Sequence, residues 1–280
     1  MRVRPAAVAG SFYPAEPNEL RESLHECFTS HRLGPQGKRF PSSSLLGGIV
    51  PHAGYVYSGP CAAHFYSCLN LDARCVVLLG VNHGGGGARA ALSPLDHWET
   101  PLGKVQVDQD LARELKHRSD LLEEDEEPHL REHSIEVQLP FLQSLFSDFT
   151  FLPLSLSYLS DRECEDLGLS VARVYEAATA AGKKTVIVAS SDLSHYLSPK
   201  ETERLDQMAL EPVLALDPSG LLKTVEEENI SMCGVIPAAV FLFAAKALGA
   251  KQAQLLKHCH SGDAVPMREV VGYASVAVEL

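Results

Sequence analysis

Three short apolar runs that each lead into a histidine are the feature that most constrains this chain. The first run, Leu45–Val50, stops at Pro51 and is followed at once by His52. An apolar run of this length between Gly and Pro signals predicts a buried strand. In open α/β sheets, ligand sites lie just beyond the carboxyl ends of the strands. His52 is therefore a candidate site residue.

The same arrangement recurs twice along the chain. A strand predicted at 75–81 leads into His83, and a strand predicted at 185–189 leads into Asp192 and His195. Taken singly, each histidine could be a hydrogen-bonded structural residue, and Asp192 could cap the turn after its strand. Unrelated structural histidines have no reason to share one sheet edge, however. The recurrence therefore predicts an active-site rim and favours a metal site.

The remainder of the chain alternates predicted helices with predicted strands. Helical spacing or capping signals indicate helices at 17–28, 59–69, 108–117, 161–180, 199–214, 218–228 and 237–248. Further strands are predicted at 88–95, 149–156, 254–260 and 271–280, and the last two are expected to pair antiparallel. This alternation predicts an α/β fold, a three-layer α/β/α sandwich with a mixed, mostly parallel central sheet. We expect one domain spanning residues 1–280.

Three segments are predicted to be irregular. Residues 5–14 are expected to form an ordered arm, and the acidic run at 121–128 a solvated loop. Pro140 is expected to kink a helix whose apolar stripe includes Ile135, Leu139 and Leu142.

Composition excludes several classes of protein. The 280 residues carry a net charge of −12, which argues against non-specific nucleic-acid binding. The seven cysteines are scattered and form no Cys-x-x-Cys pair, which favours a reduced protein. No apolar run approaches the roughly 20 residues that span a bilayer, and no signal peptide is recognisable. We expect a cytoplasmic protein that binds neither membrane nor nucleic acid.

The chemistry of the candidate residues indicates which ion they would hold. Imidazole nitrogens from His52 and His83 and the thiolate of Cys233 suit iron, copper or zinc better than magnesium or calcium. Cys233 could instead be a buried small hydrophobe. His133, which lies between two glutamates at the start of a predicted helix, could be a partner of a ligand, a substrate contact or a helix-terminal histidine paired with a glutamate. A Ser-Asp-His triad is disfavoured because no Gly-x-Ser-x-Gly elbow is present.

Six motifs, in this order along nearly the whole chain, resemble those of the Memo family, the middle component (protein B) of the AmmeMemoRadiSam system. They are Ala9-Gly10-Ser11-Phe12-Tyr13-Pro14, Pro51-His52-Ala53-Gly54-Tyr55, Gly80-Val81-Asn82-His83, Glu132-His133-Ser134-Ile135-Glu136, Ser190-Ser191-Asp192-Leu193-Ser194-His195-Tyr196 and Cys233-Gly234. The resemblance implies a fold similar to the class III extradiol (LigB-type) dioxygenases, which hold non-haem iron with two histidines and a glutamate.

By this resemblance, His52 and His83 fall on the two histidine ligands and His195 on the acid/base histidine. Cys233 would complete the metal site, with Asp192 close by. A cysteine in place of the carboxylate puts ring-cleaving oxygenation in doubt. The family has been linked to iron and copper binding, to copper-related redox chemistry and, in animals, to cell-motility signalling.

We expect a metal-binding protein, holding iron(II), copper or zinc, with oxidoreductase or dioxygenase-like chemistry. His195 and Asp192 are the predicted catalytic residues, and Tyr13, Tyr55 and His133 are predicted to line the substrate pocket. The alternative is a scaffold that holds a peptide or protein partner in a vestigial dioxygenase cleft. A third reading, a partner of a radical-enzyme system, rests on the family resemblance alone.

Overall fold

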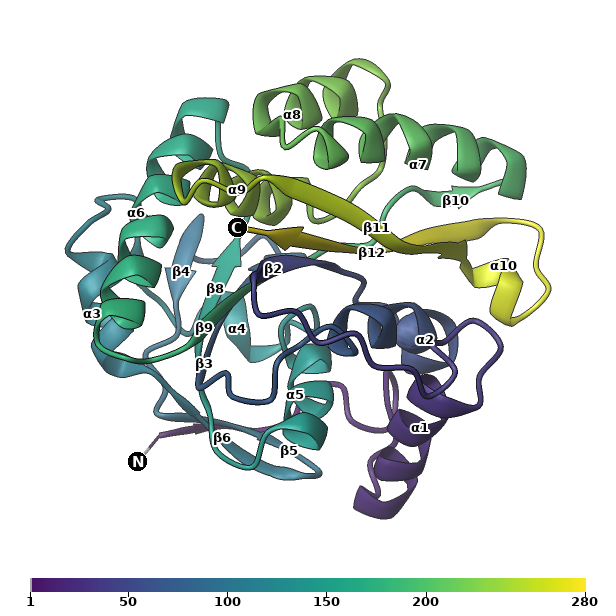
Figure 1. The fold of residues 1–280 in the computed structure, drawn as a ribbon, viewed down its shortest axis with the longest axis horizontal. Helices are drawn as coiled ribbons and strands as arrows, with labels where there is room; N and C mark the ends of the chain where they lie inside the picture. The colour runs from purple at the N-terminus through teal and green to yellow at the C-terminus, as the bar shows by residue number, and fades with distance from the viewer. Residues whose placement is uncertain (1) are drawn as a thin grey trace.

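A single mixed β-sheet forms the centre of the protein, seen in a computed structural model that describes residues 2–280 (Figure 1). Within these residues the sheet has twelve strands. Nine lie side by side in the order β1 (Val3–Arg4), β5 (His97–Thr100), β6 (Gly103–Val107), β8 (Thr150–Leu156), β3 (Cys75–Val81), β9 (Thr185–Ser190), β2 (Leu45–Val50), β12 (Val270–Glu279) and β10 (His195–Leu197). At the margins, β11 (Gln252–His260) pairs with β12, and β4 (Ala90–Leu92) pairs with β8 and β7 (Glu123–Glu124).

Helices cover both faces of this sheet, which confirms the predicted three-layer α/β/α sandwich. One face packs against α3 (Gln109–Lys116), α6 (Asp161–Ala180), α7 (Pro199–Leu214), α8 (Pro218–Glu227) and α9 (Val235–Ala247). The other face packs against α1 (Pro17–Thr29), α2 (Tyr55–Tyr66) and α5 (Leu139–Leu145). The remaining helices are short: α4 (Glu127–Leu130), the 3-10 helix η1 (Glu136–Gln138) and α10 (Ser261–Ala264).

The central strands are apolar on both sides because both sides are buried. In β3, Val77 and Leu79 face the core beneath α6 and α9, whereas Val76 and Leu78 face the core beneath α1, α2 and α5. Successive side chains of a strand point to opposite faces, so a strand between two helical layers needs a continuous apolar run. This requirement explains why the runs stood out in the sequence.

The register of these strands brings their carboxyl ends together. β2 pairs parallel with β9, so that Val50 lies opposite Ser190. β9 also pairs parallel with β3, so that Ala189 lies opposite Leu79. The three loops that follow these strands therefore leave the sheet at the same edge.

Most predicted elements are confirmed, including α6 and α7 at their predicted bounds and the antiparallel pairing of β11 with β12. Pro140 lies in the first turn of α5, where a missing N–H costs nothing, and η1 directly precedes this helix. Two features differ from the expectations. The turn at 100–103 joins two strands, β5 and β6, that were not predicted. The acidic run is not all loop, since it contains β7 and the start of α4. Among residues 2–280, none of the helices is long and apolar enough to cross a membrane.

A buried ion pair fixes the N-terminal arm to the sheet. Arg4 and Glu136 are both fully buried, and Nη1 of Arg4 lies 2.5 Å from Oε2 of Glu136. The Glu136 carboxylate also accepts hydrogen bonds from the backbone of Ala7 and Val8 and from the Tyr13 hydroxyl. Burying a charge is costly unless it is paired and its remaining polar atoms are satisfied. Here one carboxylate orders the whole arm.

We expect Arg4→Met to destabilise the protein by about 3–5 kcal/mol, because it leaves the Glu136 charge buried without its partner. The free energy of unfolding from urea titration measures this effect. The control is Arg113→Met, which removes a solvent-exposed pair with Asp110 and should cost at most about 1 kcal/mol. Equal losses in the two variants would contradict a structural role for the Arg4 pair.

His129 is another buried group, and it makes the stability of the fold depend on pH. Its ring packs edge-on against Trp98, with the centroids 5.6 Å apart, and the Arg4 guanidinium lies nearby. Burial and that positive charge lower the pKa of His129 to about 3. Between its ordinary pKa of 6.5 and pH 3, the unfolded chain therefore binds a proton at this position that the folded protein does not bind.

Stability should consequently fall as the pH falls below 6.5, and His129 should contribute a slope of up to about 1.4 kcal/mol per pH unit. We expect His129→Phe to reduce this slope, measured by urea unfolding at several pH values between 7.5 and 5. His117→Phe, at an exposed position, is the control and should leave it unchanged. If both variants keep the wild-type slope, His129 is not a source of acid sensitivity.

Candidate metal centre

His52 lies immediately beyond β2 and is fully buried. Its backbone N–H donates to Oδ1 of Asp192 at 2.8 Å, which ties the end of β2 to the loop after β9. Its ring Nδ1 lies 2.8 Å from the hydroxyl of Ser190 at the end of β9. The pairing of β2 with β9 thus fixes both the backbone and the ring of His52.

The hydrogen bonds of Ser190 determine which ring nitrogen of His52 carries the proton. The Ser190 hydroxyl lies 2.7 Å from the carbonyl oxygen of Ser134, which can only accept, so the single hydroxyl proton is donated there. Nδ1 of His52 must then donate to Ser190. Nε2 is left without a proton, and it accepts a hydrogen bond from the Cys233 thiol, whose Sγ lies 3.1 Å away.

His83 is oriented in the same way by a carboxylate. Its Nδ1 lies 2.9 Å from Oε1 of Glu132, and its backbone N–H donates to Oε2 of the same residue at 2.9 Å. The carboxylate also accepts from the backbone N–H groups of His133 and Ser134. Because an ionised carboxylate only accepts, Nδ1 of His83 donates, and Nε2 is the ring nitrogen available to a metal. Glu132 thus serves to orient His83.

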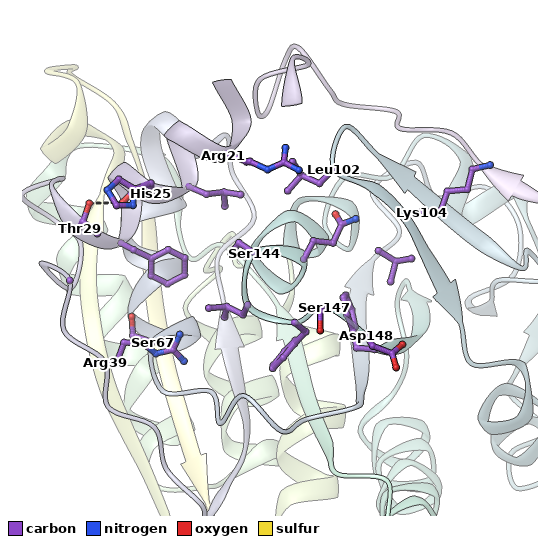
Figure 2. A pocket seen from close by; sticks show the side chains of 18 of the residues that line it. Arg21, His25, Thr29, Arg39, Ser67, Leu102, Lys104, Ser144, Ser147 and Asp148 are labelled. Carbon is purple, nitrogen blue, oxygen red and sulfur yellow. Dashed lines mark hydrogen bonds between the residues drawn. The ribbon is translucent and has the colours of Figure 1, made fainter. Parts of the chain in front are cut away.

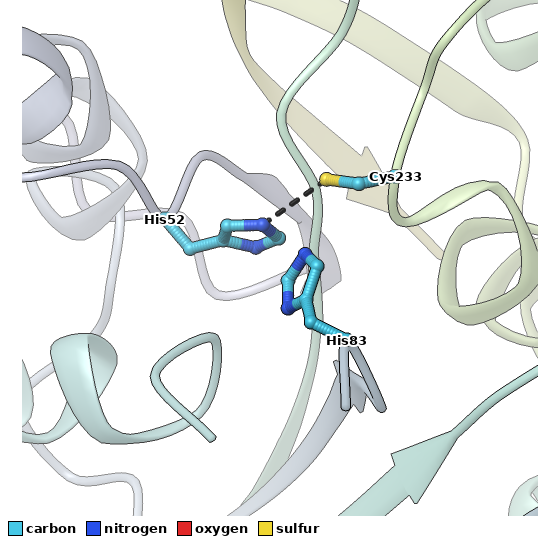
Figure 3. A group of neighbouring side chains, drawn as sticks. All are labelled: His52, His83 and Cys233. Carbon is cyan, nitrogen blue, oxygen red and sulfur yellow. Dashed lines mark hydrogen bonds between the residues drawn. The ribbon is translucent and has the colours of Figure 1, made fainter. Parts of the chain in front are cut away.

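Cys233 reaches this pair of imidazoles from the loop that precedes α9. Gly234 makes the approach possible, because a side chain there would collide with the carbonyl of Ser190 and with Ser191. One ligand atom from each of His52, His83 and Cys233 can be chosen so that all three lie within 4.8 Å of one another. Figure 3 shows the two rings, from different strand ends, facing the sulfur. Ligand atoms around a tetrahedral zinc ion lie about 3.5 Å apart, so modest side-chain rotation would suffice.

Burial keeps two of the three candidate ligands, His52 and Cys233, uncharged. Desolvation, together with the neighbouring His133 and His83, lowers the pKa of His52 well below its ordinary value. Desolvation and the Asp192 carboxylate raise the pKa of the Cys233 thiol well above its ordinary value. Neutral imidazoles have the lone pair that a metal needs, and a coordinated thiol loses its proton to the metal's field. The donor set therefore fits a cation such as iron, copper or zinc.

His195 and Asp192 flank this cluster. The ring Nδ1 of His195 lies 2.8 Å from the carbonyl oxygen of Ser231, so it donates there and Nε2 is the nitrogen that can accept a proton. An irregularity in the pairing of β10 with β12 occurs at this residue, and the next residue, Tyr196, has a φ of 58°. Such a backbone is rare for a bulky side chain and marks a constrained site. Asp192 is buried, which raises its pKa to about 6.

A cavity of about 640 Å³ opens above the cluster. Its lining includes all the predicted metal and catalytic residues and also His133, whose ring stacks on His83 with the centroids 4.6 Å apart. Tyr13 and Tyr55 do not line it. Their hydroxyls donate to Glu136 and to the Val137 carbonyl within the core.

Several residues at the site were not predicted from the sequence. The cavity is lined by Phe12 and Tyr57, which are near neighbours of Tyr13 and Tyr55 in the chain. The choice between adjacent aromatic residues depends on side-chain direction in the arm and in the first turn of α2, which no spacing rule gives. Ser190 and Glu132 belong to the recognised motifs, but only the folded structure shows that they bind His52 and His83.

Comparison with known proteins gives a consistent result. The family model described as Memo-like protein matches residues 4–277. The MEMO1 family protein MK0963 of Methanopyrus kandleri is 40% identical over 282 residues, covering 98% of each chain. MEMO1 family proteins of Desulfurococcus amylolyticus and Ignicoccus hospitalis are 41% and 42% identical and cover 99% and 100% of both chains, respectively.

The hydrogen bonds predict an unusual protonation state that can be measured directly. In metal-free protein at neutral pH, we expect His52 and His83 to be in the Nδ1–H tautomer, because Ser190 and Glu132 accept from that nitrogen. Nitrogen-15 NMR of the histidine rings distinguishes the tautomers, with the exposed His117 as an internal reference for an unconstrained ring. An Nε2–H tautomer at either position would contradict the assignment.

Proposed function

The chain belongs to the Memo family, and we propose that it is a mononuclear metal-binding protein with oxidoreductase-like chemistry. In this proposal His52, His83 and Cys233 hold iron(II) or copper, and zinc would bind the same donors. The observation that carries it is the pair of hydrogen bonds from Nδ1 of both imidazoles, which orient the rings and leave Nε2 of each as the nitrogen available to a metal. Metal-binding histidines usually donate their other N–H to a carboxylate or another acceptor in this way.

The thiolate is the part of the donor set that selects the ion. Thiolate and imidazole together favour iron, copper or zinc over magnesium and calcium, which require oxygen ligands. Three protein ligands would leave further positions for a small substrate, as in catalytic metal sites. When bound, the metal would supply a Lewis acid or a one-electron redox centre at the floor of the cavity.

The residues around the cavity would then handle protons and orient the substrate. His195 presents Nε2 as a general base, because Nδ1 is committed to the Ser231 carbonyl. Asp192 holds the backbone of His52 in place and lines the same cavity. His133, stacked on His83 and against Phe12, provides a flat wall for a substrate.

A second candidate function, a scaffold that binds a peptide or protein partner, is favoured by the exposed aromatic rim of the cavity. Tyr196 is 73% exposed, and Tyr57 and Met267 are each 37% exposed. Exposed apolar side chains gathered at a cavity mouth are typical of interaction sites. This function predicts that a partner still binds after the metal has been removed. Dependence of partner binding on the metal would count against it.

We expect anaerobically purified protein to contain close to one equivalent of metal, and a His52→Ala/His83→Ala double variant to contain almost none. Elemental analysis by mass spectrometry measures the metal content. A sharper comparison uses Ser190→Ala, which keeps all three ligands but removes the acceptor of His52. Its metal affinity, from competition with a chelator, should fall about 10- to 100-fold.

The matched control is Ser170→Ala, which changes a buried serine in α6, away from the candidate ligands. Its metal affinity should match that of the wild type. Negligible iron and copper in wild type and double variant alike would remove the metal hypothesis.

Protein loaded with iron(II) or copper also tests the redox part of the proposal. Oxygen uptake with an added reductant should depend on Cys233. If the metal-loaded protein consumes no oxygen, it binds metal but lacks the proposed chemistry.

A further inference from the structure

A second cavity lies away from the candidate metal ligands. It has a volume of about 820 Å³ and lies between α1, the loop at 37–39, β6 and the segment at 143–149 (Figure 2). Phe149 immediately precedes β8, and Ser67 follows α2 on the way to β3. The cavity is therefore at the amino ends of the parallel strands, whereas His52 and His83 follow their carboxyl ends.

The floor of this cavity is apolar and incompletely covered. Phe28, Leu102, Leu145 and Phe149 pack on the core beneath α1, α2 and α5 but remain only partly buried. They come from α1, the turn between β5 and β6, and the segment at 143–149, so the open apolar surface is a property of the fold and not of one helix. The volume of the cavity falls within the range of small-molecule sites, about 300 to 1,000 Å³, and its apolar floor would bury part of such a ligand.

The rim is basic, although the chain as a whole carries a net charge of −12. Arg21, Lys38, Arg39 and Lys104 line the cavity with a single carboxylate, Asp148. No ion pair within residues 2–280 involves any of these four cations. In Figure 2 the side chain of Arg21 reaches from α1 toward Leu102 on the opposite side of the cavity.

The guanidinium groups keep most of their donors available. Arg21 makes one long hydrogen bond, of 3.4 Å, from Nη1 to the carbonyl of Pro17. Arg39 donates through Nη2 to the carbonyl of Leu69 at 2.8 Å. An arginine has five N–H donors in a planar fork that matches carboxylate and phosphate oxygens. The rim is thus suited to hold an anionic group directly above an apolar floor.

We propose that this cavity is a second ligand site, for a small amphiphile with an apolar body and an anionic headgroup. The apolar body packs on Phe28, Leu145 and Phe149, and the headgroup, a carboxylate or a phosphate ester, binds Arg21 and its neighbouring cations. This site is independent of the proposed metal centre. It lies at the other edge of the sheet and is lined by different, mostly basic and apolar, residues.

The test is calorimetric titration of the full chain with three ten-carbon probes below their micelle concentrations: decyl phosphate, decanoate and decan-1-ol. We expect at least one anionic probe to bind about tenfold or more tightly than the alcohol, the range expected for a charge-assisted hydrogen bond. The better of the two anions identifies the headgroup. Equal binding of all three probes, or no binding, would overturn the proposal.

Two variants with the same change of charge locate the site. Arg21→Glu/Lys104→Glu should lower the affinity for the anionic probe about tenfold or more and leave the affinity for the alcohol unchanged. Lys223→Glu/Lys251→Glu, on exposed positions outside the cavity, should bind like the wild type. His52→Ala should also bind like the wild type, which separates this result from the fate of the metal hypothesis. Equal weakening in both double variants would reduce the effect to net charge and refute a specific site.

Discussion

The parallel pairing of β2, β9 and β3 is the constraint on which the rest of the site depends. Residue 50 of β2 lies opposite residue 190 of β9, and residue 79 of β3 lies opposite residue 189 of β9. The loops that carry His52, His83 and Asp192 must therefore begin at one edge of the sheet. Parallel strands need helical crossovers on both faces. The same requirement that buries β3 on two sides therefore delivers the histidines to one place. A one-residue slip would turn each strand's side chains to the wrong face and move the loops apart.

Polar contacts beneath the cluster turn this coarse arrangement into defined ligand positions. Ser190 and Glu132 each accept from one ring nitrogen, and each is held by other hydrogen bonds. Gln138 donates to the Ser190 hydroxyl while its own carbonyl accepts from Tyr66. These polar atoms lie in a dry interior, where an unsatisfied group is costly. The network therefore has few alternative arrangements, and the protein can hold two imidazoles with Nε2 of each available to a metal before any ion arrives.

The sequence revealed those parts of the structure that depend on local pattern. Apolar runs bounded by Gly and Pro identified β2, β3 and β9, and the capping residue Asp108 identified α3, because these features act within a few residues. The hairpin of β5 and β6 escaped prediction, since only Trp98, Val105 and Val107 in it are clearly apolar and buried. The side chains of Tyr13 and Tyr55 were expected in the cavity, but Glu136 and the Val137 carbonyl bind their hydroxyls in the core. Those partners lie more than 80 residues away along the chain.

The charges around the cluster would favour a bound cation at this site. Desolvation keeps His52 and Cys233 neutral, yet two carboxylates, Glu132 and Asp192, lie against the same ligands. A positive ion between the imidazoles and the thiol would be stabilised by both carboxylates and would allow the thiol to ionise. A neutral or anionic group in that position would gain neither effect, so the electrostatics of the floor favour a cation over a neutral or anionic ligand.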